Sequence, residues 1–530
     1  MKAMQYRGHR LDSLPTHRNR RAWSDHVFVR ATTWVFSVVG LGTAPWSAIA
    51  QQVTFATDVS AQTTWTDNSG LQVAAVAVED VMTEITPNLS VLAVSKRFRL
   101  TGDVGATAVN FLNETQRDRV VPRVRLVGSL EAIERLLFLD ASVSTSQLVE
   151  NPFGGRAEGA STVNSFTTTT YVVSPYIDWR MSPRARLLMR SDNTRTEARG
   201  STDPISDGAL SRQQVRLDVL PQPMGLTIEA ERIDSRFSGL SQDTLLQKIA
   251  RAIVSYAPSP EWVLNLRGGY EENLFGGLSR VNESIYGGGF EWRPTERTAV
   301  RGVGEHRFFG SGWDAVFSHR MPWLAWDLRT ARVLSTSPQG LLTLASGGNV
   351  ISLLDAILTT RYPDPVERAR VVQDLIRRQG LPTSIGGPLT IYTQQAFIST
   401  GRSITLGLLG LTNTLSFTAG YLRIEGVFSD AIVQSPAGVG NSEQLASAMT
   451  YARRLSPFSA ISLTAGRTYI RSLGNIAIAE TRQQALRLVF THQLSSRGEV
   501  LVGASRQLSV SANQVDYTEN GAFVGFSKRF

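Results

Sequence analysis

The chain has 530 residues, of which 42% are hydrophobic and 19% charged, with a formal net charge of +9 and no cysteine. The absence of cysteine excludes a disulfide framework and thiolate metal sites, and it suits passage through an oxidising compartment. No segment beyond residue 50 contains the roughly 20 consecutive apolar residues that a membrane-spanning helix needs, so any crossing of a membrane would use strands.

Residues 1–50 are predicted to be a secretory signal peptide. Several arginines precede the apolar stretch Ala31–Ala44, and Ala48-Ile49-Ala50 forms a small-x-small site, so we predict cleavage near Ala50. These residues carry seven of the 54 basic and two of the 45 acidic residues, which leaves a formal charge of about +4 on the rest of the chain. A charge this close to balance argues against a nucleic-acid partner.

From residue 51 onward, segments of alternating apolar and polar side chains follow one another, as in Leu226, Ile228 and Ala230 with their polar neighbours. Short turns such as Ser182-Pro183 alternate with longer loops such as Asn151–Ser165, and aromatic residues lie close to the turns. This pattern predicts an all-β fold. The predicted fold is a transmembrane antiparallel β-barrel over residues 51–530, with an even number of strands, about 22 in a range of 16–22. Both termini and the short turns would be periplasmic, and the longer loops would point outward.

The predicted strands include residues 84–96 and 390–408, but one stretch between strands is predicted to be helical. Within an insertion over residues 335–389, the apolar positions of residues 350–358 form one helical stripe. A second helix begins with the capping signal Asp364-Pro365-Val366-Glu367 and ends at Gly380. The sequence leaves open whether this helical insertion plugs the barrel or caps its outer loops.

The last ten residues, Gly521–Phe530, resemble the final strand of bacterial outer-membrane barrels. Val524, Phe526 and the terminal Phe530 lie on one face of a strand with a period of two. The resemblance implies that these three residues form the signal that the barrel-assembly machinery reads. Lys528 departs from the pattern, although its ammonium group would lie near enough to the interface to reach water. The alternative for this stretch alone is the last strand of a soluble β-sandwich.

Four stretches carry a resemblance to a known family: Thr64–Asn68, Ile85–Val91, Tyr362–Pro382 and Gly410–Phe417. Together they resemble the uncharacterised outer-membrane proteins that are associated with the PEP-CTERM and exosortase protein-sorting system, over most of residues 51–530. Genes of that family tend to lie among exopolysaccharide-synthesis genes. The resemblance implies an outer-membrane location and a role as a conduit or assembly factor in exopolysaccharide export or PEP-CTERM protein sorting. It transfers no catalytic residue.

Arginines on the predicted polar faces are the main chemical signal. A guanidinium group stays charged and binds carboxylates through paired hydrogen bonds, so a lumen lined this way would favour anions. Acidic polysaccharide is therefore a candidate partner, in addition to outer-membrane lipids. Glu229 and Glu305 lie on or near the same faces, so an arginine-carboxylate network that only stiffens the wall is an open alternative. The candidate lumen-lining residues are Arg186, Arg190, Arg212, Arg216, Arg267, Arg301, Arg307 and Arg487.

The three histidines beyond residue 50 are His306, His319 and His492, on separate predicted strands. Neither a catalytic triad nor a metal site is evident around them, so we expect no catalytic residue, metal or cofactor. His306 and His319 belong to neighbouring strands and could approach one another. The predicted function is a non-enzymatic outer-membrane barrel. A general diffusion porin and an outer-membrane barrel hydrolase are the alternatives.

Overall fold

The computed structural model describes residues 52–156, 163–201, 207–237, 245–275, 280–335, 350–382, 396–427, 441–473, 479–512 and 515–530. The predicted signal peptide and its cleavage site lie outside the described residues, as do parts of the predicted insertion over residues 335–389.

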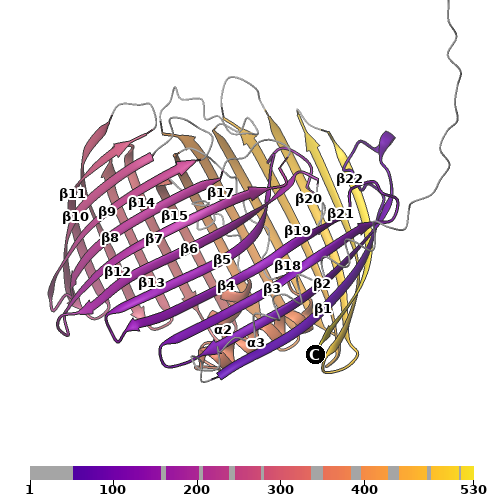
Figure 1. Ribbon diagram of the computed structural model, residues 1–530, viewed down its shortest axis with the longest axis horizontal. Coiled ribbons are helices and arrows are strands. Elements are labelled where there is room, and N and C mark those ends of the chain that lie inside the picture. Colours follow the sequence, from indigo (N-terminus) through magenta and orange to yellow (C-terminus); the bar gives the residue numbers. More distant parts are fainter. Residues whose placement is uncertain are drawn as a thin grey trace, which may run out of the picture. The chain divides into compact units, whose positions relative to one another are not determined.

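Twenty-two antiparallel strands form one sheet that closes on itself (Figure 1). Each strand pairs with the next along the chain, and Asp58–Thr66 of the first strand also pairs with Gly521–Arg529 of the last. The prediction of a barrel with an even strand number is therefore confirmed. The strands are β1 (Gln52–Thr66), β2 (Asp80–Val94), β3 (Phe98–Phe111), β4 (Arg119–Ile133), β5 (Leu137–Val149), β6 (Ser165–Arg180), β7 (Ala185–Arg199), β8 (Gly208–Val219), β9 (Met224–Phe237), β10 (Leu245–Ser259), β11 (Trp262–Leu274), β12 (Val281–Thr295), β13 (Thr298–Arg307), β14 (Gly310–Arg320), β15 (Leu324–Ser335), β16 (Phe397–Leu409), β17 (Asn413–Gly426), β18 (Ser442–Arg454), β19 (Ser459–Ser472), β20 (Glu480–Gln493), β21 (Gly498–Ser511) and β22 (Tyr517–Arg529).

The two ends of the barrel differ in their connections. At one end, which we call the turn end, short connections such as residues 95–97 join β2 to β3, β4 to β5 and so on, and both β1 and β22 have their terminal ends there. At the other end, the loop end, most connections are longer, although only Phe308 and Phe309 separate β13 from β14. This alternation matches the pattern of short turns and longer loops in the sequence.

Most strand boundaries differ from the predicted ones by a few residues, as at the start of β2. β2 begins at Asp80 and not at residue 84, because β1 extends to Thr66 and its register places Thr66 opposite Asp80. Backbone pairing with a long neighbour therefore extends the strand beyond its recognisable alternation. β16 is described from Phe397 onward, and residues 390–395 of the predicted strand lie outside the described part of the chain.

The predicted helices are present between β15 and β16, as α2 (Val350–Leu358) and α3 (Pro365–Gln379). A short 3-10 turn, η3 (Ala74–Val76), lies between β1 and β2. α3 ends at Gly380, whose φ of +60° suits glycine, and the N–H of Leu381 donates to the carbonyl of Ile376 at 2.9 Å. Among the described residues, no helix is long and apolar enough to cross a membrane.

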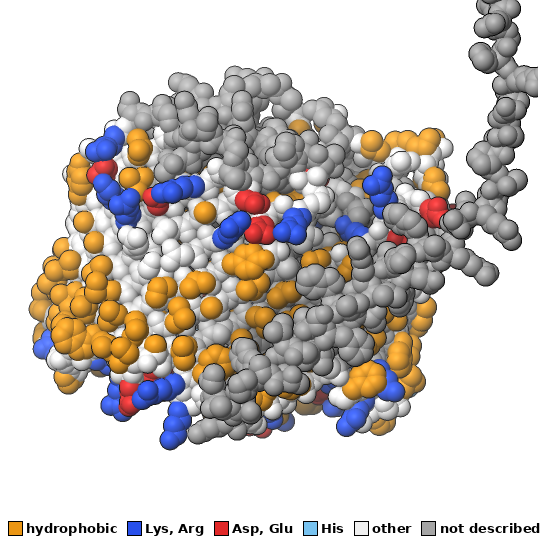
Figure 2. Space-filling model, viewed as in Figure 1, with side chains coloured by type: hydrophobic (Ala, Val, Ile, Leu, Met, Phe, Trp, Pro, Cys, Tyr) orange, Lys and Arg blue, Asp and Glu red, His pale blue; other side chains and the backbone are white. Residues whose placement is uncertain are grey.

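The outward faces of the strands form an apolar belt between two rows of aromatic side chains. Tyr171, Tyr270 and Tyr286 are exposed toward the loop end, and Trp179 and Trp323 toward the turn end. Exposed aliphatic side chains lie between these rows: Val254, Leu264, Leu266, Leu486, Leu488 and Val502. On the face seen in Figure 2, apolar side chains gather in a band with charged side chains above and below it. A closed sheet satisfies its own backbone hydrogen bonds, so this belt identifies a transmembrane barrel.

Candidate functional site

The inward face of each strand is the face opposite the apolar belt. In β18, the exposed Met449 and Tyr451 alternate with the buried Ala448 and Ala452, against which the two helices pack. Residues directly opposite each other in an antiparallel pair share a face, so the strand register carries this assignment around the whole barrel.

All eight candidate arginines lie on the inward face, and at least seven of them form ion pairs with carboxylates of the wall. Arg186 pairs with Asp178 at 2.6 Å and Arg212 with Glu231 at 2.6 Å. The pairs of the other five are Arg190 with Asp140 and Asp192, Arg216 with Asp218, Arg267 with Glu305, Arg301 with Asp314, and Arg307 with Glu271. The guanidinium of Arg487 lies 4.0 Å from the centroid of the Phe523 ring. The charges of these seven arginines are therefore largely compensated within the wall.

The most buried part of this network joins β9, β10, β11 and β13. Arg251 donates to Glu229 at 2.9 Å and to Glu305 at 3.0 Å, and Glu305 also accepts from Arg267 at 2.8 Å. The fully buried Glu271 accepts from Arg307 at 2.6 Å and from the N–H of Phe308 at 2.9 Å. Sequence reasoning missed Arg251, although its place between Ala250 and Ala252 puts it on the polar face of an alternating strand.

The two helices lie inside the barrel, against the inner wall of strands β15–β20. Leu353 and Ile357 of α2 pack against Ala325 of β15, and Val372 of α3 belongs to the cluster that contains Ala452 of β18. A Cβ atom placed on Gly407 of β16 would lie 3.4 Å from the Cβ of Leu353, so α2 lies very close to this wall. Small wall residues are what allow the helices to approach the strands.

These contacts lie near the turn end, although the connection that contains the helices leaves β15 and enters β16 at the loop end. Gly380 accepts a hydrogen bond at 3.0 Å from the hydroxyl of Ser462, close to the first residue of β19. Figure 1 shows α2 and α3 near the end of the barrel where the C-terminus lies. The described part of the insertion therefore packs on the inner wall and not on the outer loops.

Charged side chains of α3 lie close enough to charged groups of β21 and β22 to interact with them. Asp374 forms an ion pair with Arg378 at 2.6 Å. Burial lowers the pKa of the Arg377 guanidinium and nearby Arg529 acts in the same direction, whereas the Asp374 and Glu499 carboxylates oppose that change. Within α2 and α3, Arg368 donates to Asp355 at 2.6 Å and so joins the two helices.

A second segment enters the interior at the loop end. The sequence predicts that the loop Asn151–Ser165 points outward, but residues 151–156 of this loop cross to the inner wall of strands β16–β22. Phe153 packs with Phe397, Leu422, Ile424 and Ile470. Backbone groups complete the attachment: Thr481 Oγ1 donates to the Phe153 carbonyl at 2.9 Å, Gln483 Nε2 to the Gly154 carbonyl at 3.0 Å, and the Arg156 N–H to the Tyr517 hydroxyl at 3.1 Å.

The three histidines face outward, and His306 and His319 do not approach one another. In the β13–β14 hairpin, His306 lies opposite Ser311 near the loop end, whereas His319 lies opposite Thr298 near the turn end. His306 stacks on Tyr286 with ring centroids 4.9 Å apart. The expectation that neighbouring strands could bring the two together was wrong, because antiparallel register separates them along the full length of the hairpin.

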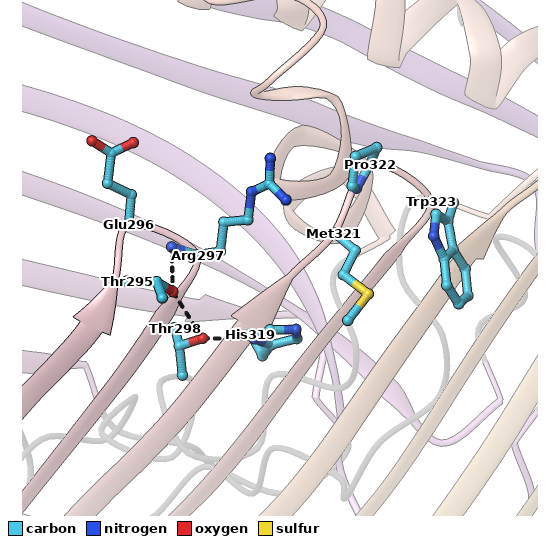
Figure 3. Close-up of a pocket in the computed structure, with 8 residues that line it drawn as sticks. All are labelled: Thr295, Glu296, Arg297, Thr298, His319, Met321, Pro322 and Trp323. Atoms are coloured by element: carbon cyan, nitrogen blue, oxygen red, sulfur yellow. Dashed lines mark hydrogen bonds between the residues drawn. The ribbon is translucent and has the colours of Figure 1, made fainter.

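A pocket of about 660 Å³ opens beside His319 at the turn end (Figure 3). His319 Nδ1 and Thr298 Oγ1 share a hydrogen bond of 2.8 Å, and Glu296 points away from the imidazole. His492 Nδ1 makes an equivalent bond to Ser459 Oγ at 2.8 Å. No described carboxylate contacts either imidazole, so neither pair has the third member of a triad. Within the described ranges, no cluster of histidine and carboxylate side chains could hold a metal ion.

Comparison with solved structures finds siderophore receptors and an outer-membrane protein among the similar chains. The siderophore receptor PirA from Acinetobacter baumannii is 10% identical and aligns over 91% of this chain and 81% of its own, with a TM-score of 0.45. OccK1 (OpdK) from Pseudomonas aeruginosa is 9% identical over 90% and 99%, and OpdQ from the same organism is 10% identical over 91% and 100%, both with a TM-score of 0.36. No protein-family model and no curated protein sequence matches the chain. These similarities are too weak to transfer a substrate or a functional residue.

Proposed function

We propose that this protein is a non-enzymatic diffusion channel of the outer membrane, similar to a porin. The observation that carries the proposal is a closed 22-stranded barrel with an apolar belt outside and a polar, arginine-rich wall inside. Closed barrels with aromatic girdles, short turns at one end and longer loops at the other are the form that proteins take in bacterial outer membranes. A polar lumen then gives hydrophilic solutes a path.

The two inward segments favour small solutes over a polymer. Residues 151–156 are attached across the loop end, and the helical hairpin is attached to the wall near the turn end. A polysaccharide chain would have to pass both, whereas a small solute needs only the space beside them. An exopolysaccharide conduit, or a role in PEP-CTERM sorting, remains the prediction from the family resemblance.

A hydrolase is the less favoured alternative. An active site would have to use one of the outward-facing histidines, and the described residues offer neither His319 nor His492 an orienting carboxylate. The geometry around these histidines suits the membrane interface better than catalysis.

Planar-bilayer recording tests the proposal. The full chain is expressed with its N-terminal segment, extracted from the outer-membrane fraction, and checked for the difference in gel mobility between unboiled and boiled samples. We expect discrete conductance steps in KCl, and larger steps after deletion of residues 350–382. A barrel that inserts but never conducts would exclude a diffusion channel. A folded protein found only in the periplasm would exclude the membrane location.

A further inference from the structure

We propose that Arg123 and Arg125 of β4, together with Arg99 of β3, form a binding site for sugar acids on the inner wall. This inference rests on the proposed function and names a solute class for the channel. The three residues are absent from the set of arginines that the sequence indicated as lumen-lining, and they differ from that set in their electrostatic surroundings.

The strand register places the three guanidinium groups on one inward surface. Arg125 lies opposite Asp103, Arg123 opposite Gly105, and Arg99 opposite Ser129. On the same face of these strands, Val109 and Val121 pack together toward the loop end, inside the barrel. The alternate residues of β4, which include Val120, Val124 and Leu126, belong to the apolar outer face.

These arginines are unpaired within the described part of the chain. Arg99, Arg123 and Arg125 are exposed, and the structure gives none of them an ion pair or a side-chain hydrogen bond to another described residue. Asp103 is the carboxylate opposite Arg125, but it accepts a hydrogen bond at 2.6 Å from the hydroxyl of Ser90. Of these three arginines, only Arg125 lies opposite a carboxylate in the strand register, whereas inward-facing arginines of β7–β15 form ion pairs with neighbouring acids.

Small and hydroxyl-bearing residues lie opposite the two central arginines on the neighbouring strands, while Val121 and Val127 flank them along β4. Gly105 lies opposite Arg123, and Ser144 of β5 lies opposite Arg125. Ser142 shares the inward face of β5 with Ser144. Small neighbours leave the guanidinium donors accessible, and a guanidinium group binds a carboxylate through two parallel hydrogen bonds. The adjacent hydroxyls provide donors and acceptors for the hydroxyl groups of a sugar.

The combination of accessible arginines and a hydroxyl-lined wall points to a ligand that carries both a carboxylate and hydroxyl groups. A neutral sugar would use only the serines, and a small anion without hydroxyls would use only the arginines. A sugar acid such as glucuronate uses both. Phosphate shares the anionic chemistry and therefore serves as the competing probe.

The test compares R123Q/R125Q with R453Q/R467Q, a control that removes two positive charges from outward-facing, exposed positions of β18 and β19. Both variants must retain the heat-dependent gel shift of the folded barrel. In bilayers, glucuronate should reduce the chloride current of the parent and of the control at the same concentration. In R123Q/R125Q the required concentration should rise about tenfold or more, because two charged hydrogen-bonding groups are lost.

Three outcomes would overturn the inference: unchanged glucuronate block in R123Q/R125Q, an equal change in the control, or block by phosphate and acetate as strong as that by glucuronate. Calorimetric titration of the detergent-solubilised barrel with glucuronate separates this inference from the proposed function. Binding by the parent that is lost in R123Q/R125Q supports the site even if no current is measured. Conductance without any glucuronate binding would support the diffusion channel and exclude the sugar-acid site.

Discussion

A pair of cysteines at Leu353 and Gly407 should form a disulfide that fixes α2 to the barrel wall. The chain contains no cysteine, so an introduced pair has no competing thiol. A Cβ atom at Gly407 would lie 3.4 Å from the Cβ of Leu353, near the spacing of about 3.8 Å that disulfides adopt. In the unfolded chain, a bond that closes a segment of about 50 residues removes conformational entropy worth roughly 4 kcal/mol. L353C/G407C should therefore oxidise readily in the periplasm.

Maleimide labelling after brief unfolding, with and without reductant, measures the bond. The oxidised double variant should resist labelling, whereas L353C and G407C alone should each react after brief unfolding. Single-channel conductance should match that of the parent, because the bond holds the hairpin where it already lies. Two thiols that react with maleimide after the oxidised sample is briefly unfolded would refute the placement of α2 against β16. A conductance that falls on oxidation would show that the hairpin normally leaves the wall.

Three further predictions concern the network, the inward loop and the last residue. E271Q should lower the free energy of unfolding by about 3 kcal/mol, because it breaks the buried pair with Arg307, whereas E134Q at the exposed pair with Arg97 should cost under about 1 kcal/mol. The temperature at which the folded gel band disappears measures both, and equal shifts would contradict the role of burial. F153A should cost about 3 kcal/mol at a side chain that is 6% exposed and should speed proteolysis near residues 151–156, whereas L411A at a 93% exposed side chain should not. Removal of Phe530 should abolish the heat-dependent gel shift, while L494A should keep it, and a normal shift without Phe530 would count against the assembly signal.

The strands were predictable because their signal is local. Alternation with a period of two is imposed by the difference between lipid and lumen, and segments such as residues 226–230 carry it in five residues. The helices were predictable for the same reason, since the stripe of residues 350–358 and the stop at Gly380 are local features. Boundaries were less predictable where a neighbouring strand extended the pairing, as Thr66 does for Asp80.

Contacts between residues far apart in the chain could not be predicted from the sequence. The inward orientation of residues 151–156 depends on the packing of Phe153 on Ile470 and on the hydrogen bond from the Arg156 N–H to the Tyr517 hydroxyl. No local sequence pattern encodes these contacts. The partners of the arginines depend in the same way on register. Arg216 and Arg125 are both arginines at alternating positions, yet Arg216 meets Asp218 and Glu229, while the acid opposite Arg125 is bound to a serine. The sequence could identify arginines on polar faces but not which of them are free.

The seam between β1 and β22 has a kinetic consequence. Thr66 donates to Glu519 at 2.8 Å and the N–H of Asn520 donates to Asp67 at 2.7 Å, in both cases across a separation of 453 residues. Bringing such distant segments together costs on the order of 5 kcal/mol in chain entropy before any contact forms. Until then, β1 and β22 each present a row of unpaired backbone groups that can pair with another chain. The sheet therefore stays vulnerable to aggregation until its final pairing, and a helper that holds the C-terminal strand would shorten that interval.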